Sequence, residues 1–220
     1  MIFERLRLIE DAVPRDGARN MAVDEMLTEQ VEGPMLRVYQ WSEPTVTFGY
    51  FEKISDVQQT RPGAKWMRRW TGGGVVDHGC DFTYSLIVPT SHPLVQGRRA
   101  ESYGIIHQAV ADFVRKTCDI ALELASVSIG DGEGCFQKPV PGDLLWNGRK
   151  IAGAAQRRTR SGLLHQGSLL GLPLRPEHAP SLAAALGNEV SSIPFTAHEE
   201  QRAEEVATTR YRRGEWLNRF

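Results

Sequence analysis

The pair Asn147-Gly148 constrains the fold more than any other feature, because it separates two strand-like segments, 143–146 and 149–152. Both residues tolerate a positive φ, which a tight two-residue β-hairpin turn requires. A second turn at Ser161-Gly162 leads into the apolar segment 163–170. We therefore predict a three-stranded antiparallel meander over residues 143–170.

The rest of the chain shows strand and helix patterns in irregular alternation. The N-terminal residues read as a strand, and further runs rich in β-branched and aromatic residues predict strands at 35–39, 45–50 and 82–88. Apolar residues at helical spacing predict helices over 21–31 and 100–118. The Gly- and Pro-rich stretch 126–142 is expected to be an irregular loop. The remainder is expected to be helical, with Thr196 and Glu199 in capping-box spacing. This order predicts an α+β fold and one domain over 1–220.

Composition excludes several classes of protein. The chain has 26 Lys and Arg against 27 Asp and Glu, a formal net charge of −1, and 41% hydrophobic residues. Such values are typical of a folded domain and argue against a protein that coats nucleic acid. No apolar run reaches the roughly 18–20 residues of a membrane span, and the charged N-terminus lacks a signal-peptide pattern. We therefore expect a cytoplasmic protein with neither nucleic acid nor membrane as a partner.

The three cysteines are Cys80, Cys118 and Cys135. An odd number without a C-x-x-C pair fits neither a disulfide framework nor a standard zinc site, so we expect no metal. Cys135 lies in a Gly-rich loop and is less typical of a core position than Cys118. By residue pattern alone it is either an unreactive loop thiol or a nucleophile that requires a nearby cation or base.

Three consecutive glycines, Gly72 to Gly74, follow Arg68-Arg69 and precede His78. Glycines permit a ligand to approach the main chain and leave N–H groups free to contact an anion or a carbonyl. The motif is neither a Walker loop nor G-x-G-x-x-G. A ligand-binding loop and a flexible hairpin with solvated arginines both remain open from this pattern.

Lys150 and His165 are the remaining candidates for chemistry. Lys150 follows the predicted hairpin turn and is either a solvated strand end or a cation facing a carboxylate, phosphate or polarised carbonyl. His165 precedes Gln166-Gly167-Ser168 in a strand context, where structural histidines are common. A triad of Cys135, His165 and Asp143 is conceivable, but the spacing gives it no support.

Taken together, these segments resemble the lipoate-protein ligase and octanoyltransferase branch of the biotin/lipoate protein ligase superfamily. The resemblance extends over nearly the whole chain. The matching segments are 20–25 (NMAVDE), 46–51 (VTFGYF), 68–74 (RRWTGGG) with His78, 148–156 (GRKIAGAAQ) and 165–170 (HQGSLL). One departure is Ala154, where many members carry serine.

The resemblance implies the fold shared by biotin protein ligases and class II aminoacyl-tRNA synthetases, with a mixed, largely antiparallel sheet. It implies an octanoyl or lipoyl substrate in an apolar tunnel beside the glycines. The acceptor would be a lysine of a lipoyl carrier domain, in the E2 component of a 2-oxoacid dehydrogenase or in the glycine cleavage H protein. Lys150 would bind the acyl carbonyl or an acyl-adenylate. The substrate-binding residues implied are Arg69, Thr71, Gly72, Gly73, Gly74, His78, Gly153, Ala154, His165 and Gly167.

Two branches of this family differ in chemistry. Ligases activate lipoate with ATP and usually need an accessory domain or a separate partner protein. One group of transferases takes octanoate from acyl carrier protein through a cysteine thioester, and Cys135-Phe136 followed by Pro139 resembles its cysteine segment. The segment 209–216, with Tyr211 and Trp216, also resembles the C-terminus of that group. We therefore expect a transferase with Cys135 and Lys150 as catalytic residues, no accessory domain and no tightly bound cofactor.

Three alternatives remain open at this stage. The first is an ATP-dependent ligase that forms lipoyl-AMP, for which ATP and Mg would be required. The second is an amidotransferase that moves the acyl group between two carrier domains. The third is a non-catalytic module that binds a lipoyl group.

Overall fold

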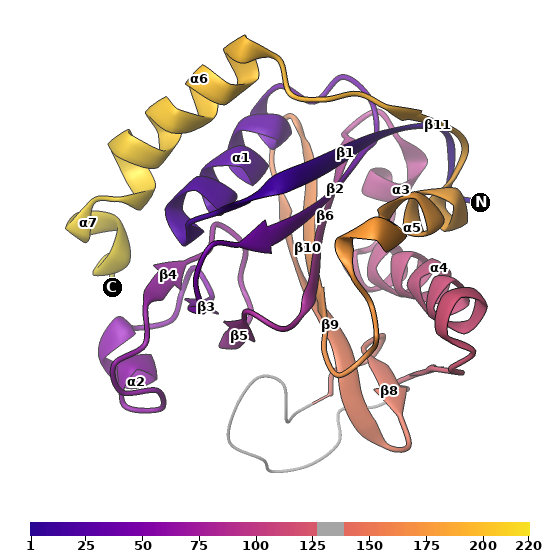
Figure 1. Cartoon of the computed structure of the whole chain (residues 1–220), viewed down its shortest axis with the longest axis horizontal. Coiled ribbons are helices and arrows are strands. Elements are labelled where there is room, and N and C mark those ends of the chain that lie inside the picture. The colour runs from indigo at the N-terminus through magenta and orange to yellow at the C-terminus, as the bar shows by residue number, and fades with distance from the viewer. Residues whose placement is uncertain (127–138) are drawn as a thin grey trace.

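The computed structural model of the chain describes residues 1–126 and 139–220. Within these residues an eight-stranded sheet forms the centre of the molecule (Figure 1). Its strands, in spatial order, are β11 (Gly187–Ser192), β1 (Phe3–Arg15), β2 (Met35–Trp41), β6 (Phe82–Pro89), β10 (Gly162–Leu169), β9 (Arg149–Arg158), β8 (Leu144–Trp146) and β7 (Glu123–Leu124). A second, three-stranded sheet has the order β4 (Trp66–Arg68), β3 (Thr45–Phe48) and β5 (Val76–His78).

The helices follow the chain between these strands. They are α1 (Gly17–Glu29), α2 (Ile54–Gln58), α3 (Pro93–Gln96), α4 (Arg99–Cys118), a 3₁₀ turn (Pro176–His178), α5 (Ala179–Leu186), α6 (Ala197–Val206), a π-helical turn (Ala207–Tyr211) and α7 (Gly214–Leu217). In the part of the chain that the structure describes, no helix is long and apolar enough to cross a membrane.

The pairing of the strands confirms the predicted α+β fold with a mixed, largely antiparallel sheet. Strand β1 runs parallel to both β11 and β2, and the remaining pairs of the main sheet are antiparallel. The predicted hairpin turn is confirmed as well, because Asn147 and Gly148 have φ of 49° and 74°. Strands β8, β9 and β10 form the expected meander.

Two predicted element assignments are wrong. The segment after residue 170 is not wholly helical, because β11 pairs with β1 along 187–192. Its sequence, GNEVSS, is mostly exposed and lacks a strand pattern, so its conformation depends on the pairing partner. Strand β3 also ends at Phe48 instead of continuing to residue 50, because Gly49 and Tyr50 turn against the glycine loop, where Tyr50 N donates to Thr71 O at 2.9 Å.

The main sheet is covered by helices on both faces (Figure 1). Alternate residues of the central strands pack on opposite sides, as strand geometry requires. Leu86 and Val88 of β6 belong to the apolar cluster that includes residues of α4 and α5, whereas Ile87 packs with Met26 and Leu27 of α1. The fold therefore has helix, sheet and helix layers, and a separate apolar cluster packs on each face of the main sheet.

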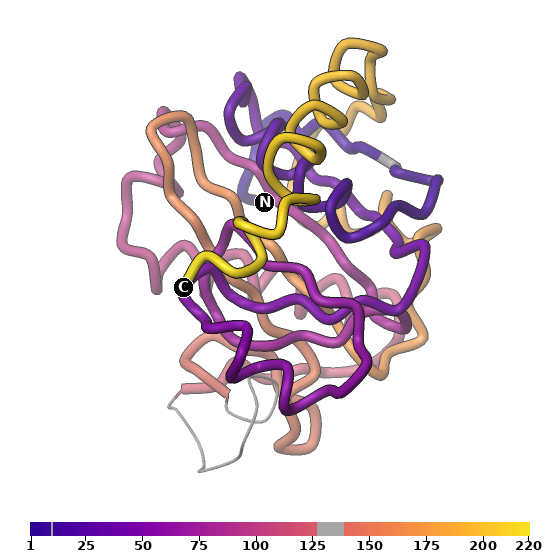
Figure 2. Tube along the Cα trace, turned by 90° about the vertical axis from the view of Figure 1, so that its left-hand side faces the viewer, coloured from indigo at the N-terminus to yellow at the C-terminus, as the bar shows by residue number. Residues whose placement is uncertain are grey.

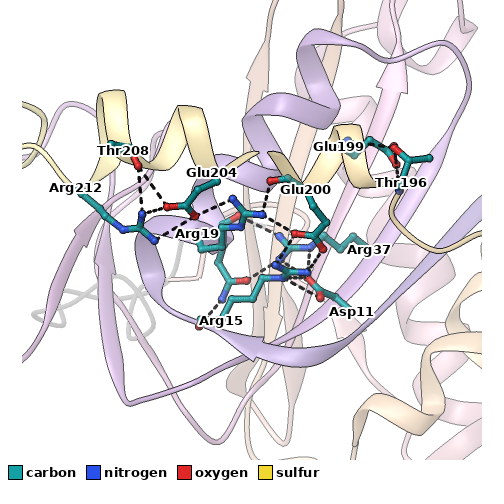
Figure 3. A network of polar contacts seen from close by, with 11 residues as sticks. Asp11, Arg15, Arg19, Arg37, Thr196, Glu199, Glu200, Glu204, Thr208 and Arg212 are labelled. Atoms are coloured by element: carbon teal, nitrogen blue, oxygen red, sulfur yellow. Dashed lines mark hydrogen bonds and ion pairs between the residues drawn. The ribbon is translucent and has the colours of Figure 1, made fainter. Parts of the chain in front are cut away.

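Helix α6 is attached to α1 and β1 largely by charged side chains (Figure 3). Glu200 accepts from Arg15 at 2.6 Å and from Arg19 at 2.5 Å, and Glu204 accepts from Arg19 at 3.0 Å. The capping box predicted at Thr196 and Glu199 is confirmed at the N-terminus of α6. These contacts fix the direction in which the chain leaves α6.

The C-terminal segment returns to the strand that precedes the glycine loop (Figure 2). The Trp216 indole donates to the carbonyl of Arg68 at 3.0 Å. The Arg68 guanidinium is fully buried and donates to the Trp216 and Leu217 carbonyls, both at 2.9 Å, and to the Tyr50 carbonyl at 2.7 Å. Arg68 is thus a structural residue, and only its neighbour Arg69 points toward the cavity described below.

Candidate functional site

A narrow cavity crosses four neighbouring strands of the main sheet. Its floor follows one row of paired residues, in which Gly153 of β9 lies opposite Ser168 of β10, Ser168 opposite Thr83 of β6, and Thr83 opposite Tyr39 of β2. Three strand spacings give this row a length of about 14 Å. The lining residues are Met21, Tyr39, Trp41, Thr47, Arg69, Gly73, Gly74, Val76, His78, Thr83, Lys150, Gly153, Ala154, Ala155, Gln166, Gly167 and Ser168.

The glycine loop forms the wall opposite this floor. Arg69 determines its shape from inside, because its guanidinium donates to the carbonyls of Gly72 at 3.0 Å and Gly74 at 2.7 Å and to Thr47 Oγ1 at 2.7 Å. A Cβ on Gly73 would lie 3.6 Å from the Cβ of Ala155, so the loop lies directly over strand β9. The loop is therefore held in one conformation against the sheet and is not a solvated hairpin.

A chain of buried polar groups joins this loop to helix α1. Thr71 Oγ1 donates to Gln166 Oε1 at 2.7 Å, and Gln166 Nε2 donates to Asp24 Oδ2 at 2.8 Å. Thr71 and Gly72 do not line the cavity in this structure. Both residues lie behind the cavity wall. The Thr71 hydroxyl there bonds the glycine loop to the central strand β10, which explains why threonine precedes the glycines.

We expect the substitution Gly49→Ala to displace the glycine loop. A Cβ on Gly49 would lie 1.7 Å from the carbonyl oxygen of Gly73 and 2.8 Å from its carbonyl carbon, both backbone atoms. Overpacking of this kind lowers the free energy of unfolding by about 1–3 kcal/mol. Gly72→Ala is the matched control, because its Cβ would meet no atom within 4 Å. Chemical denaturation compares the two variants, and equal stabilities would contradict the prediction.

Lys150 lies at the β9 end of the cavity, where only 7% of its side chain is exposed. Its ammonium is 2.8 Å from Oδ2 of Asp143, a fully buried carboxylate at the start of the meander. A Cβ on Gly153 would lie 2.7 Å from the Lys150 Cε, so glycine at this position leaves room for the lysine. Lys150 is accordingly a buried, ion-paired cation at the cavity wall and not a solvated strand end.

At the other end of the cavity, His78 is held between an aromatic ring and a carboxylate. It stacks on Trp41 with ring centroids 4.2 Å apart, and its Nδ1 is 2.8 Å from Asp81 Oδ2. Burial by itself raises the pKa of Asp81, but the adjacent His78 and the hydroxyls of Ser168 and Thr83 outweigh it and hold the pKa below its ordinary value. This end of the cavity therefore combines hydrogen-bonded polar groups with the flat ring of Trp41.

His165 was expected at the substrate site, but the structure places it behind the cavity. It is fully buried, where its Nδ1 accepts from Gln156 at 3.1 Å and its Nε2 is 3.2 Å from the Tyr84 hydroxyl. Asp143 interacts with Lys150 instead, so the conceivable triad lacks its contact between aspartate and histidine. Gly167 does line the cavity, and a side chain there would collide with the ring of Tyr84.

We expect the buried histidines to make the protein acid-sensitive. Burial lowers the pKa of His107 to about 4 and lowers the pKa of His165 well below its usual value of 6.5. Between the lowered pKa of the folded state and the usual pKa of 6.5 in the unfolded state, the unfolded chain binds protons that the folded chain does not bind. The free energy of unfolding is therefore greatest above pH 6.5 and decreases as the pH falls. Two such groups reduce the free energy of unfolding by up to about 2.7 kcal/mol per pH unit between about pH 6 and pH 4.

Urea denaturation between pH 7 and pH 4.5 measures this slope. His107→Asn should approximately halve it, whereas the exposed His198→Gln should leave it unchanged. A slope that is the same in His107→Asn as in the parent protein would show that another group is responsible.

Sequence reasoning missed two carboxylates that the structure places at this site. Asp143 was considered only as a triad member and Asp81 not at all, yet they bind Lys150 and His78. The hairpin register was the available signal for Asp143, because the antiparallel pairing puts Leu144 opposite Ala152 and so brings Asp143 close to Gly153. Of the cysteines, Cys80 is exposed and Cys118 partly buried, whereas Cys135 lies outside the described residues. No group of three potential ligands within 1–126 and 139–220 is placed to hold a metal ion.

Comparison with known proteins assigns the chain to a protein family. Residues 16–172 match the sequence model of the lipoyl protein ligase A/B catalytic domain. The chain belongs to this family. It is 36% identical over 183 residues to octanoyltransferase LipM of Moorella thermoacetica, covering 77% of this chain and 66% of that protein. It is 37% identical over 172 residues to octanoyltransferase LipM of Geobacillus kaustophilus, covering 70% and 61%. The chain thus spans about three-fifths to two-thirds of the curated relatives that it matches.

Solved structures show the same fold at low sequence identity. A lipoate-protein ligase A bound with ATP superimposes with a TM-score of 0.72 at 21% identity, covering 98% of each chain. A bi-partite lipoate protein ligase from Thermoplasma acidophilum, studied with its E2 lipoyl domain, superimposes with a TM-score of 0.70 at 20% identity, covering 99% of this chain and 96% of that one. The cavity described above therefore lies in a lipoate-ligase fold.

Proposed function

We propose that this protein is an acyltransferase of protein lipoylation, which moves an octanoyl or lipoyl group to a specific lysine of a lipoyl carrier domain. The observation that carries the proposal is the Lys150 ammonium at the wall of a narrow cavity closed by the Gly73-Gly74 main chain. An extended chain of eight carbons, with bonds of about 1.5 Å, is about 9 Å long and fits within the row that the cavity follows. The identity to octanoyltransferases LipM supports octanoate and the transferase reaction.

We propose acyl carrier protein as the donor and Cys135 as the nucleophile. The Cys135 thiolate attacks the carbonyl carbon of the octanoyl thioester, a new C–S bond forms, and the bond to the carrier thiol breaks. The carrier leaves as a thiolate, which takes up a proton. The deprotonated amine of the acceptor lysine of the lipoyl domain then attacks the carbonyl carbon of the acyl-enzyme. An amide forms as the C–S bond breaks, the amine gives up a proton to solvent, and Cys135 is released as thiolate. These two steps need neither ATP nor a tightly bound cofactor.

In both steps, the Lys150 ammonium would stabilise the carbonyl oxygen of the acyl group. Negative charge develops on this oxygen as each tetrahedral intermediate forms, and a fixed ammonium in a buried site stabilises such charge more than water does. Arg69, His78, Gly153, Ala154 and Gly167 would contact the acyl chain, because all five line the cavity, whereas Thr71, Gly72 and His165 would support its walls.

Chain connectivity permits Cys135 to reach this end of the cavity. The Val140 N–H donates to Asp143 Oδ2 at 2.8 Å, on the same oxygen that Lys150 contacts. Cys135 lies five positions before Val140 in the chain, and five residue steps of extended chain span at most about 18 Å.

Mass measurement after acid quenching tests the covalent step. Incubation with octanoyl acyl carrier protein should add one octanoyl group to the protein, and Cys135→Ala should abolish the addition completely. Cys118→Ala is the matched control and should be acylated like the parent protein. Equal acylation of the parent protein and Cys135→Ala, or none of either, would rule out the thioester route.

A parallel incubation separates the alternatives. Formation of lipoyl-AMP from ATP, Mg and lipoate, with activity retained in Cys135→Ala, would indicate the ligase reaction. Acyl transfer only from an octanoylated H protein to an E2 lipoyl domain would indicate an amidotransferase. Stoichiometric binding of lipoate without turnover on any carrier domain would indicate a binding module.

A further inference from the structure

Asp143 links Lys150 to helix α4, an element that does not line the cavity. Its Oδ2 lies 2.8 Å from the Lys150 ammonium, and its Oδ1 accepts a hydrogen bond of 2.5 Å from the Tyr103 hydroxyl. The carboxylate is fully buried. One oxygen of the carboxylate therefore contacts the cavity lysine and the other a phenol of α4.

The Tyr103 hydroxyl also holds the strand that carries the lysine. The N–H of Ala154, a cavity-lining residue of β9, donates to this hydroxyl at 2.9 Å. A phenol oxygen that accepts from the strand and donates to the carboxylate fixes the two relative to each other. The carboxylate that holds the Lys150 ammonium is thereby fixed to strand β9, which carries the lysine.

Helix α4 fixes the backbone around Asp143 in the same way. His107 Nδ1 donates to the Gly142 carbonyl at 2.6 Å, and its ring packs on that of Tyr103 with centroids 4.3 Å apart. A Cβ on Gly142, whose φ is +91°, would lie 2.7 Å from Cδ1 of Tyr103. The Tyr103 ring thus packs directly on the α-carbon that precedes Asp143, where only glycine leaves room.

This support matters because lysine has a long, flexible side chain. An ammonium stabilises a developing oxyanion only if it already lies where the charge forms, and its own rotamers would otherwise disperse it. Burial and the adjacent Asp143 raise the pKa of Tyr103, so the phenol keeps the proton that it donates.

We propose that Tyr103 is a positioning residue that holds the Lys150 ammonium at the cavity wall through Asp143. The proposal rests on the acyl-transfer function proposed above and adds to it a residue on a helix outside the cavity.

A double-mutant cycle of Tyr103→Phe and Lys150→Gln tests the proposal, with kcat for octanoyl transfer as the readout. Tyr103→Phe should lower kcat about 10-fold, since a hydrogen bond to a charged group is lost, with a smaller change in KM. In the Lys150→Gln background the same change should have almost no effect, because no ammonium remains to be positioned. Tyr84→Phe is the control: this fully buried tyrosine bonds His165, so its effect should be equal in both backgrounds.

An equal loss from Tyr103→Phe in both backgrounds would overturn the proposal, because a residue that only stabilises the fold acts without regard to Lys150. If Lys150→Gln itself keeps full activity, Lys150 does not have the proposed role in the reaction. The positioning role of Tyr103 is then tested by a measurement that does not depend on activity. Lys150 should react with a small amine-labelling reagent at least five-fold faster in Tyr103→Phe than in the parent protein or Tyr84→Phe. Unchanged labelling would overturn the positioning role.

Discussion

Replacement of Lys150 by glutamine should lower kcat for octanoyl transfer by about 10²–10³-fold, the usual effect of removing one group that stabilises an oxyanion. The side chain is almost fully enclosed at the cavity wall, and glutamine keeps its approximate length without the charge. The measurement is the rate of amide formation on a lipoyl domain at saturating octanoyl acyl carrier protein.

Two further variants separate catalysis from folding in this experiment. Arg149→Gln removes an exposed neighbouring charge and should retain the parent rate within about two-fold. Lys150→Gln also leaves Asp143 without its ammonium, so the double variant Lys150→Gln with Asp143→Asn should be more stable than the single one and equally inactive. Recovery of the rate in the double variant would mean that the single variant had lost its fold and not its catalytic group.

Replacement of Arg37 by methionine should lower the free energy of unfolding by about 3–5 kcal/mol, the usual result of breaking a buried ion pair on one side. Arg37 is fully buried between β1, β2 and α1. Its Nη1 contacts Asp24 at 2.7 Å and its Nη2 contacts Asp11 at 2.8 Å. Methionine would leave the buried carboxylate of Asp24 without its cation, whereas Asp11 would keep its ion pair with Arg15.

Chemical denaturation measures this effect, with Arg5→Met as the matched control. Arg5 pairs with Glu189 on the surface, where 86% of its side chain is exposed, and its loss should cost no more than about 0.5 kcal/mol. Because Asp24 also accepts from Gln166, which holds Thr71, we expect Arg37→Met to loosen the glycine loop as well. A change below about 1 kcal/mol would show that the Asp24 carboxylate finds another partner.

Local sequence patterns predicted most strands and helices, because these patterns report short-range preferences. The positive φ of Asn147 and Gly148 is a property of those two residues in any tight hairpin, and the Thr196 capping box acts within one turn of helix. Strand β11 had no such signal. Its residues are extended because β1 offers an open edge in parallel register, a partner about 180 residues away in the chain.

For the site, the sequence by itself determined the chemical types: a loop of glycines, a lysine after a hairpin turn, and membership of a family with a known arrangement of motifs. Only the tertiary structure decided which groups meet. It placed Asp143 between Lys150 and Tyr103. It also put His165 behind the cavity wall and stacked His78 on Trp41 at the far end of the cavity. The reason is physical: a buried charge must find its partner in space, and sheet register and helix packing supply partners that residue spacing along the chain does not encode.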